Sequence, residues 1–247
     1  MSAVLESSRP VRGPWPVELS ARVALLGTGQ VAQALARRID ALGQRGEAPP
    51  LLLAHAGNSR GSLSGQTQAW SETVIALSAA PVARHRDPLP QLGPDIDLVI
   101  DLTASDAVAS LHAEWLERGI GVVTANKRGL GEGEERARRL ADAIASGAQY
   151  GDSATVGAGL GAVRRLRELR ACGENVFEIA GVLSGTLAWL FDHFDGRHPF
   201  SALVREAHAL GLTEPDPRDD VGGGDVVRKL RILARAVGWH VADDAIR

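Results

Sequence analysis

Residues 22–43, RVALLGTGQVAQALARRIDALG, constrain the fold more than any other stretch of the sequence. The apolar run over residues 23–26 is typical of a buried parallel strand. Small residues follow it in G-x-G-x-x-A spacing, namely Gly27, Gly29 and Ala32. The apolar residues beyond the glycines recur at helical spacing: Val31, Leu35, Ile39 and Leu42. The segment therefore predicts a strand, a tight glycine turn and a helix.

A strand, turn and helix of this kind suit the pyrophosphate of a dinucleotide. Gly27 permits the tight turn, Gly29 lets the backbone approach the phosphates, and Ala32 lets helix and strand pack closely. The helix N-terminus offers free N–H groups and the positive end of its dipole. A glycine turn without a ligand is the alternative. The residues expected to contact the cofactor are those of the turn: Gly27, Thr28, Gly29, Gln30 and Val31.

Strands and helices continue to alternate after this unit. Apolar strands are expected at residues 50–56, 97–105 and 119–127, with helices near 106–117 and 132–145. Such alternation implies crossover connections between parallel strands. The sequence therefore predicts an α/β fold with a Rossmann-like, doubly wound parallel sheet.

The pattern changes near residue 147, where glycine-rich segments begin. A weakly alternating strand is expected within residues 175–183, and helices at about 199–210 and 225–237. The second part is expected to be of the α+β class. The predicted organisation has three parts: an N-terminal arm over 1–20, a dinucleotide-binding domain over 21–150, and a substrate-binding and dimerisation domain over 151–247.

The composition argues against several classes of protein. The chain has 247 residues, of which 45% are hydrophobic, and a formal net charge of -3, so no basic excess indicates a nucleic-acid or membrane-surface partner. No apolar run reaches the roughly 18 residues of a membrane span. The single cysteine, Cys172, fits a reducing compartment. We therefore expect a globular cytoplasmic protein.

The end of the second expected strand indicates which nucleotide binds. An acidic residue there holds the ribose 2′-hydroxyl of NAD, whereas an arginine accommodates the 2′-phosphate of NADP. The sequence is HAGNSRG, with Asn58, Ser59 and Arg60 and no acid. We therefore expect NADP to be preferred over NAD, with Arg60 on the 2′-phosphate. The alternative is that Arg60 is a solvated loop charge.

Six segments occur in an order that resembles the homoserine dehydrogenase family, including the dehydrogenase part of fused aspartokinase–homoserine dehydrogenases. They are GTGQVAQAL, TANK, ATVGAGL, GVLSGTL, TEPDPRDD and DVVRKLRILAR. The resemblance implies a reversible NAD(P)-dependent interconversion of L-homoserine and L-aspartate 4-semialdehyde. This reaction lies on the route to threonine, methionine and isoleucine. The resemblance also implies a homodimer that pairs through the substrate domain.

The resemblance also implies roles for single residues. Thr103 and Lys127 match cofactor-contacting positions, and Lys127 is a candidate cation beside the carbonyl or carboxylate of the substrate. Glu214 and Asp225 match the residues that hold the substrate, and Lys229 matches the lysine proposed as proton donor.

A sodium site is implied in some members of the family, through backbone carbonyls. The matching positions here are Val156, Ala158 and Leu160. A glutamate often stands where this chain has Ser153, and that departure weakens the expectation of a cation.

Other interpretations of the acidic stretch TEPDPRDDVGGGDVVRKL stay open. Asp225 and Lys229 are spaced i,i+4, as in an ordinary surface pair on a helix. Asp216 fits a turn built by prolines, and the roles of Asp219 and Asp220 are undecided. Clustered carboxylates also suit a divalent cation, but the order of a calcium loop is absent.

Alternatives to the implied activity also stay open. Catalytic domains of the family continue beyond the segment that ends here near Trp239, so the second domain is expected to be C-terminally incomplete. The alternatives are a non-catalytic NADP-binding or interaction subunit, and another NADP-dependent dehydrogenase of an amino-acid aldehyde.

The expected role of Arg60 gives a test of cofactor choice. Arg60→Ala should lower kcat/KM with NADP relative to NAD, because it removes a cation that pairs with the 2′-phosphate. Steady-state rates with each cofactor give the ratio, and an unchanged ratio contradicts the assignment.

Overall fold

The computed structural model describes residues 20–79, 92–213 and 216–242. The chain divides into two compact units, Met1–Thr103 and Ala104–Arg247. The domain boundary expected near residue 150 stays a prediction. No helix in the described ranges is long and apolar enough to cross a membrane.

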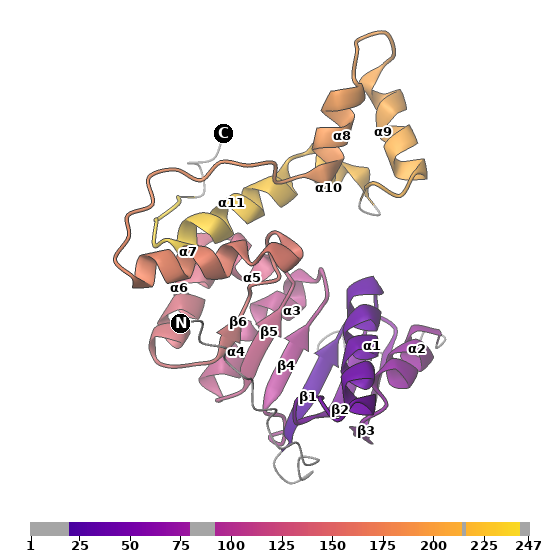
Figure 1. Cartoon of the computed structure of the whole chain (residues 1–247), viewed down its shortest axis with the longest axis vertical. Helices are drawn as coiled ribbons and strands as arrows, with labels where there is room; N and C mark the ends of the chain where they lie inside the picture. Colours follow the sequence, from indigo (N-terminus) through magenta and orange to yellow (C-terminus); the bar gives the residue numbers. More distant parts are fainter. Residues whose placement is uncertain (1–19, 80–91, 214–215, 243–247) are drawn as a thin grey trace, which may run out of the picture. The chain divides into compact units, whose positions relative to one another are not determined.

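The first unit contains a mixed sheet with two helices (Figure 1). Strands β2 and β4 run parallel to β1, and β3 runs antiparallel to β2, in the order β3-β2-β1-β4. The elements are β1 (Ala21–Leu26), α1 (Gln30–Gln44), β2 (Leu51–Asn58), β3 (Gly61–Thr67), α2 (Trp70–Ala79) and β4 (Leu98–Asp101).

The strand, turn and helix predicted from residues 22–43 are present, with one change in the buried face. Helix α1 packs on the sheet through Ala32, Ala36 and Ile39. Val31, which has the spacing of the apolar face, is 58% exposed in the first turn of the helix. Small alanine side chains occupy two of these three positions, which agrees with the close helix–strand packing that the small residue at position 32 predicts.

Strand β3 was not expected from the sequence. Its residues, GSLSGQT, are small or polar, and the interior of the strand is exposed. An edge strand of this kind lacks apolar alternation, which is the main sequence signal for a strand. Its pairing with β2 therefore depends on backbone hydrogen bonds more than on side-chain burial.

The glycine turn after β1 is a close approach of two backbone segments. Gly27 has φ +99°, and its N–H donates to Gly57 O at 2.7 Å. A Cβ at this position would lie 2.7 Å from the carbonyl oxygen of Leu102. Glycine is therefore required at position 27 by both conformation and space.

The second unit is mostly helical, with the parallel pair β5 and β6. Up to residue 151 its elements are α3 (Asp106–Ser110), α4 (His112–Glu117), β5 (Gly121–Thr124), α5 (Arg128–Gly131), α6 (Glu134–Ala145) and β6 (Tyr150–Gly151). Beyond residue 151 they are the 3-10 turn η2 (Ala158–Leu160), α7 (Ala162–Ala171), α8 (Gly185–His193), α9 (Phe200–Ala209), α10 (Pro217–Val221) and α11 (Gly224–Ala236).

The strand expected within residues 175–183 does not form, and these residues adopt no regular structure. Its apolar side chains are exposed, Phe177 by 89% and Val182 by 81%. A strand requires a hydrogen-bonded neighbour, and alternation in the sequence does not supply one. The single helix expected over 106–117 is also divided, at Leu111, into α3 and α4.

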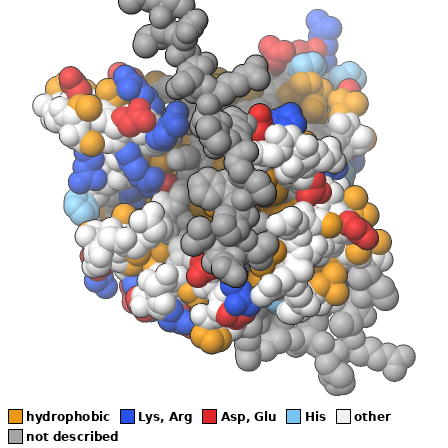
Figure 2. Space-filling view, turned by 60° about the horizontal axis from the view of Figure 1, so that its bottom comes forward, with side chains coloured by type: hydrophobic (Ala, Val, Ile, Leu, Met, Phe, Trp, Pro, Cys, Tyr) orange, Lys and Arg blue, Asp and Glu red, His pale blue; other side chains and the backbone are white. Residues whose placement is uncertain are grey.

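Two groups of helices organise the second unit (Figure 1). Helix α11 packs against α5 and α7. Helices α8 and α9 pack together, and Phe200 contacts Phe194 edge to face and stacks with Phe191. On the face shown in Figure 2, acidic and basic side chains lie among apolar ones.

The geometry of the glycine turn predicts a contrast between its two glycines. Gly27→Ala should lower the free energy of unfolding by about 2–4 kcal/mol, because the new Cβ meets a backbone carbonyl at positive φ. Gly29 has φ -72°, and no atom lies within 4 Å of the position that a Cβ would take, so Gly29→Ala should cost less than about 1 kcal/mol. Denaturant unfolding of both variants measures the difference, and equal losses contradict this explanation.

Candidate active site

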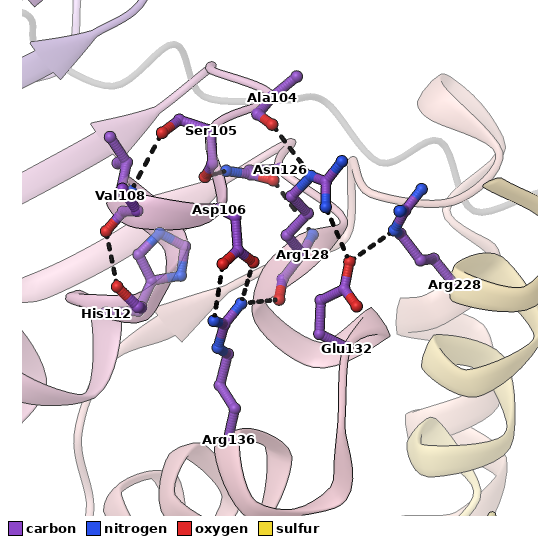
Figure 3. Close-up of polar contacts among 12 residues, drawn as sticks. Ala104, Ser105, Asp106, Val108, His112, Asn126, Arg128, Glu132, Arg136 and Arg228 are labelled. Atoms are coloured by element: carbon purple, nitrogen blue, oxygen red, sulfur yellow. Dashed lines mark hydrogen bonds and ion pairs between the residues drawn. The ribbon is translucent and has the colours of Figure 1, made fainter. Parts of the chain in front are cut away.

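Helix α11 is held on the last turn of α5 by a close backbone approach and by arginines. A Cβ on Gly131 would lie 2.8 Å from the Cβ of Arg228. Arg228 donates to the Glu132 carboxylate at 2.7 Å, and Arg128 donates to the same oxygen at 3.1 Å (Figure 3). Arg235, two turns further along α11, donates to the backbone oxygens of Leu130 and, at 2.7 Å, Glu132. The position of α11 is therefore fixed against α5.

The turn before α5 is fixed by a buried amide. Asn126 is 2% exposed, and its side chain donates to Ser105 O at 2.9 Å (Figure 3). Its Oδ1 accepts from the N–H of Arg128 at 3.1 Å, and its own N–H donates to Thr124 Oγ1 at 2.8 Å. Lys127 follows directly in the sequence, so its backbone is held at the start of α5.

Lys127, Asp225 and Lys229 meet in the second unit. The Lys229 ammonium lies 2.5 Å from the Asp225 carboxylate, and the Lys127 ammonium lies 3.3 Å from it. Lys229 also donates to the carbonyl of Leu183 at 2.6 Å. The i,i+4 pair anticipated on α11 therefore forms, but it is partly buried and includes a second cation from another element. An ordinary surface pair has neither feature.

Lys127 and Lys229 are the only lysines in the sequence. The other 25 of the 27 basic residues are arginines. A chain that uses arginine everywhere else places both of its lysines on one carboxylate. The scarcity of lysine is visible in the sequence, and it is the signal that marks Lys127 and Lys229 as a pair.

The environment of Asp225 favours its ionised form. Burial raises the pKa of this carboxyl, but the hydrogen bond from Lys229 and the charges of Lys127 and Lys229 outweigh burial and leave the pKa below its ordinary value. The carboxylate therefore keeps two ammonium groups together in a partly desolvated place.

A cavity of about 620 Å³ adjoins the two lysines. Lys127 and Lys229 supply its polar wall, and apolar side chains such as Ile179, Val182 and Leu233 supply much of the rest. The three residues matched to the sodium site, Val156, Ala158 and Leu160, line the same cavity. A small polar molecule that carries a carbonyl or carboxylate could bind here against the ammonium groups.

The segment that carries these three residues is anchored by a buried ion pair. Asp152 is fully buried, and Arg167 of α7 donates to both of its carboxylate oxygens. Thr155 donates its N–H and its hydroxyl to the carbonyl of Asp152, at 2.9 and 2.7 Å. The tight turn that follows has positive φ at Gly157, Ala158 and Gly161. The cavity wall is therefore built on an ordered turn.

The acidic stretch before α11 divides into separate structural roles. Asp216 accepts from the N–H of Arg218 at the start of α10, and the Arg218 guanidinium holds the pKa of Asp216 at about 2. Asp220 is buried and accepts from the Thr186 hydroxyl at 3.2 Å. Glu214, predicted to hold the substrate, lies outside the described residues. No group of three or more His, Cys, Asp or Glu side chains in the described ranges is arranged to hold a metal ion.

Two of the segments predicted to contact the cofactor are connected in the first unit through Asn58. Its amide donates to Thr28 Oγ1 at 2.9 Å, and its carbonyl oxygen accepts from the N–H groups of Arg60 and Gly61. Asn58 therefore connects the glycine turn to the turn that carries Arg60. Thr103 follows β4, and its N–H donates to the buried Asp101 at 2.9 Å. Asn58 was expected only as a small polar neighbour of Arg60.

The strand, glycine turn and helix place this chain among the Rossmann-like dinucleotide-binding proteins. Residues 27–150 match the sequence model described as "Homoserine dehydrogenase, NAD binding domain", and residues 162–247 match that described as "Homoserine dehydrogenase". The chain belongs to the homoserine dehydrogenase family.

Similar proteins include much longer ones. The chain is 43% identical over 151 residues to bifunctional aspartokinase/homoserine dehydrogenase 2 of Escherichia coli (strain K12), a match that covers 61% of this chain and 19% of that protein. It is 42% identical over 154 residues to homoserine dehydrogenase of Emericella nidulans, which covers 60% of this chain and 42% of that protein. The chain thus spans less than half the length of these relatives.

The fold is also that of a solved structure. A hyperthermophilic archaeal homoserine dehydrogenase in complex with NADPH superposes with a TM-score of 0.73 at 22% identity. The match covers 89% of this chain and 70% of that one.

Asp225 gives a prediction for stability against pH. The pKa of Asp225 in the folded chain lies below the ordinary value of 3.8. Its ion pairs therefore stabilise the fold fully above pH 3.8, and this stabilisation is lost as the pH falls toward the folded-state pKa. Asp225→Asn should therefore lower the free energy of unfolding at pH 7 by about 1–3 kcal/mol, with the difference from wild type shrinking below pH 4. Denaturant unfolding at several pH values measures this.

The control is Asp142→Asn, which removes an exposed i,i+4 partner of Arg138 at 3.4 Å. It should change the free energy of unfolding by less than about 0.5 kcal/mol. An Asp225→Asn effect as small as the control, or one that grows as the pH falls, contradicts the proposed ion-pair stabilisation.

Proposed function

We propose that this chain is a homoserine dehydrogenase, which interconverts L-homoserine and L-aspartate 4-semialdehyde with NADP. The observation that most strongly supports this proposal concerns the two lysines of the chain, which belongs to the homoserine dehydrogenase family. Both lysines contact Asp225 beside one cavity. Reduction of an aldehyde requires a proton for the nascent alkoxide and cations to orient the carbonyl and carboxylate. The cavity provides both kinds of group.

Lys229 is the proposed proton donor. Its ammonium is held by two acceptors, Asp225 and the carbonyl of Leu183, and one N–H remains for a substrate oxygen. Lys127 is the proposed cation for the substrate's carbonyl or carboxylate, placed by the same Asp225. Glu214 and Asp225 are proposed to hold the substrate, whose ammonium a carboxylate can bind.

All of the proposed cofactor residues except Lys127 belong to the first unit. The backbone of the glycine turn, Gly27 to Val31, is proposed to bind the pyrophosphate, and Arg60 the 2′-phosphate of NADP. Thr103 and Lys127 are further proposed contacts. When bound, the nicotinamide supplies the hydride. The connection of Asn58 to both Thr28 and the turn of Arg60 supports this grouping.

A sodium ion fits these residues only in part. Val156, Ala158 and Leu160 lie on one tight turn, which suits backbone ligands. The neighbouring carboxylate, Asp152, is committed to Arg167 through both of its oxygens, and Ser153 brings no charge. No step of the proposed reaction uses a sodium ion.

The division into domains, the homodimer and the cytoplasmic location belong to the same proposal. The ranges matched by the two family models support a boundary near residue 150. Exposed apolar side chains, Phe177, Val182 and Phe191 among them, support pairing through residues 151–247. A single cysteine supports a reducing compartment.

The activity is tested by homoserine-dependent reduction of NADP, followed by absorbance. Lys229→Ala should lower kcat by about 10²–10⁴-fold, because it removes the general acid–base group, with little change in NADPH affinity. Arg138→Ala, on the exposed face of α6, is the control and should leave kcat unchanged.

Other outcomes support the alternatives. NADPH binding without turnover of any short aldehyde supports a non-catalytic subunit. Faster turnover of another amino-acid aldehyde than of aspartate 4-semialdehyde supports a different dehydrogenase. Near-normal kcat in Lys229→Ala removes Lys229 from the mechanism.

A further inference from the structure

The Lys127–Asp225 contact joins two elements that are far apart in the sequence. Asp225 and Lys229 share α11 and lie one turn apart, so their pairing is a local property of that helix. Lys127 belongs to the start of α5, so its 3.3 Å distance from Asp225 depends on how α5 and α11 dock.

Glu132 lies at the centre of that docking. Its Oε1 accepts from Arg128 of α5 at 3.1 Å and from Arg228 of α11 at 2.7 Å (Figure 3). The three side chains are only 21–29% exposed. Arg228 immediately precedes Lys229 in the sequence, so a contact that fixes Arg228 also fixes the turn of α11 that carries the lysine.

The surrounding contacts leave little freedom for another arrangement. Gly131 brings the α5 backbone against Arg228, and Arg235 occupies the carbonyls of Leu130 and Glu132. On the other side, Arg136 donates to Asp106 at 2.7 Å and to the carbonyl of Arg128 at 3.0 Å (Figure 3). Glu132 is the one side chain among these that bonds to cations from both α5 and α11.

We propose that Glu132 is a positioning residue, which sets the distance between the Lys127 ammonium and the Asp225–Lys229 pair by holding Arg228 of α11 to Arg128 of α5. Glu132 has no contact of its own with the proposed substrate cavity. Its loss should separate Lys127 from Asp225 and leave the helix-internal Lys229–Asp225 pair intact.

The presence of only two lysines makes this directly measurable. Selective isotope labelling of lysine gives one set of side-chain NMR signals from Lys127 and one from Lys229, assigned with Lys127→Arg and Lys229→Arg. Asp225→Asn marks where each signal lies when the carboxylate is absent. In Glu132→Gln the Lys127 signal should move toward its position in Asp225→Asn, and the Lys229 signal should stay near that of wild type.

The kinetic consequence rests on the proposed function. In Glu132→Gln, kcat for homoserine oxidation should fall about 10-fold or more, because misplacement of a catalytic group by about 1 Å can cost about 10²-fold. If wild type does not oxidise homoserine, the proposed function fails and the NMR measurement still decides the role of Glu132.

The matched control is Glu117→Gln, which breaks an exposed 2.6 Å ion pair between α4 and Arg139 of α6 in the same unit and involves no residue of α5 or α11. It should move neither lysine signal and should leave kcat unchanged. Arg228→Gln is the second variant, used if circular dichroism shows that Glu132→Gln is unfolded, and it should move the Lys127 signal in the same direction. An unmoved Lys127 signal in the folded variant, or an equal movement in Glu117→Gln, overturns the inference.

Discussion

The docking of α11 on the last turn of α5 is the constraint on which the candidate site depends. Gly131 permits the two backbones to approach, and Glu132 accepts from an arginine on each side. Arg235 then occupies the carbonyls that α5 leaves free at its C-terminal end. Because Lys127 precedes α5 and Lys229 lies on α11, this contact decides whether the two ammonium groups share Asp225.

Arginine and lysine occupy different kinds of place in this chain. Arginine makes the structural contacts, with Arg167 on buried Asp152, Arg228 on Glu132 and Arg136 on Asp106. A guanidinium suits such places because its fork is planar and it stays charged. Lysine occurs only at the cavity, where a compact ammonium can orient a substrate oxygen and give up a proton.

Much of the fold was predictable from periodicity. The strand, glycine turn and helix of residues 20–44 follow the sequence pattern, as do the later strands at 98–101 and 121–124. Strand β3 was missed because polar edge residues carry no alternation. The strand expected within residues 175–183 was wrong, because alternation in a single segment does not supply a pairing partner. Val31 has helical apolar spacing yet is exposed, because the packed face of α1 is made by Ala32, Ala36 and Ile39.

The sequence by itself determined the fold class of the first unit and the family of the chain. It also singled out Lys127 and Lys229 as the two lysines. A glycine turn and a residue type that occurs twice are local or countable features, so they need no fold to be recognised. The tertiary structure alone decided that Lys127 and Lys229, 102 positions apart in the sequence, contact the same carboxylate. It also decided that Arg228 donates to Glu132. A contact between such distant segments depends on how the helices pack and on the space left by Gly131, which the residue spacing within either segment does not show.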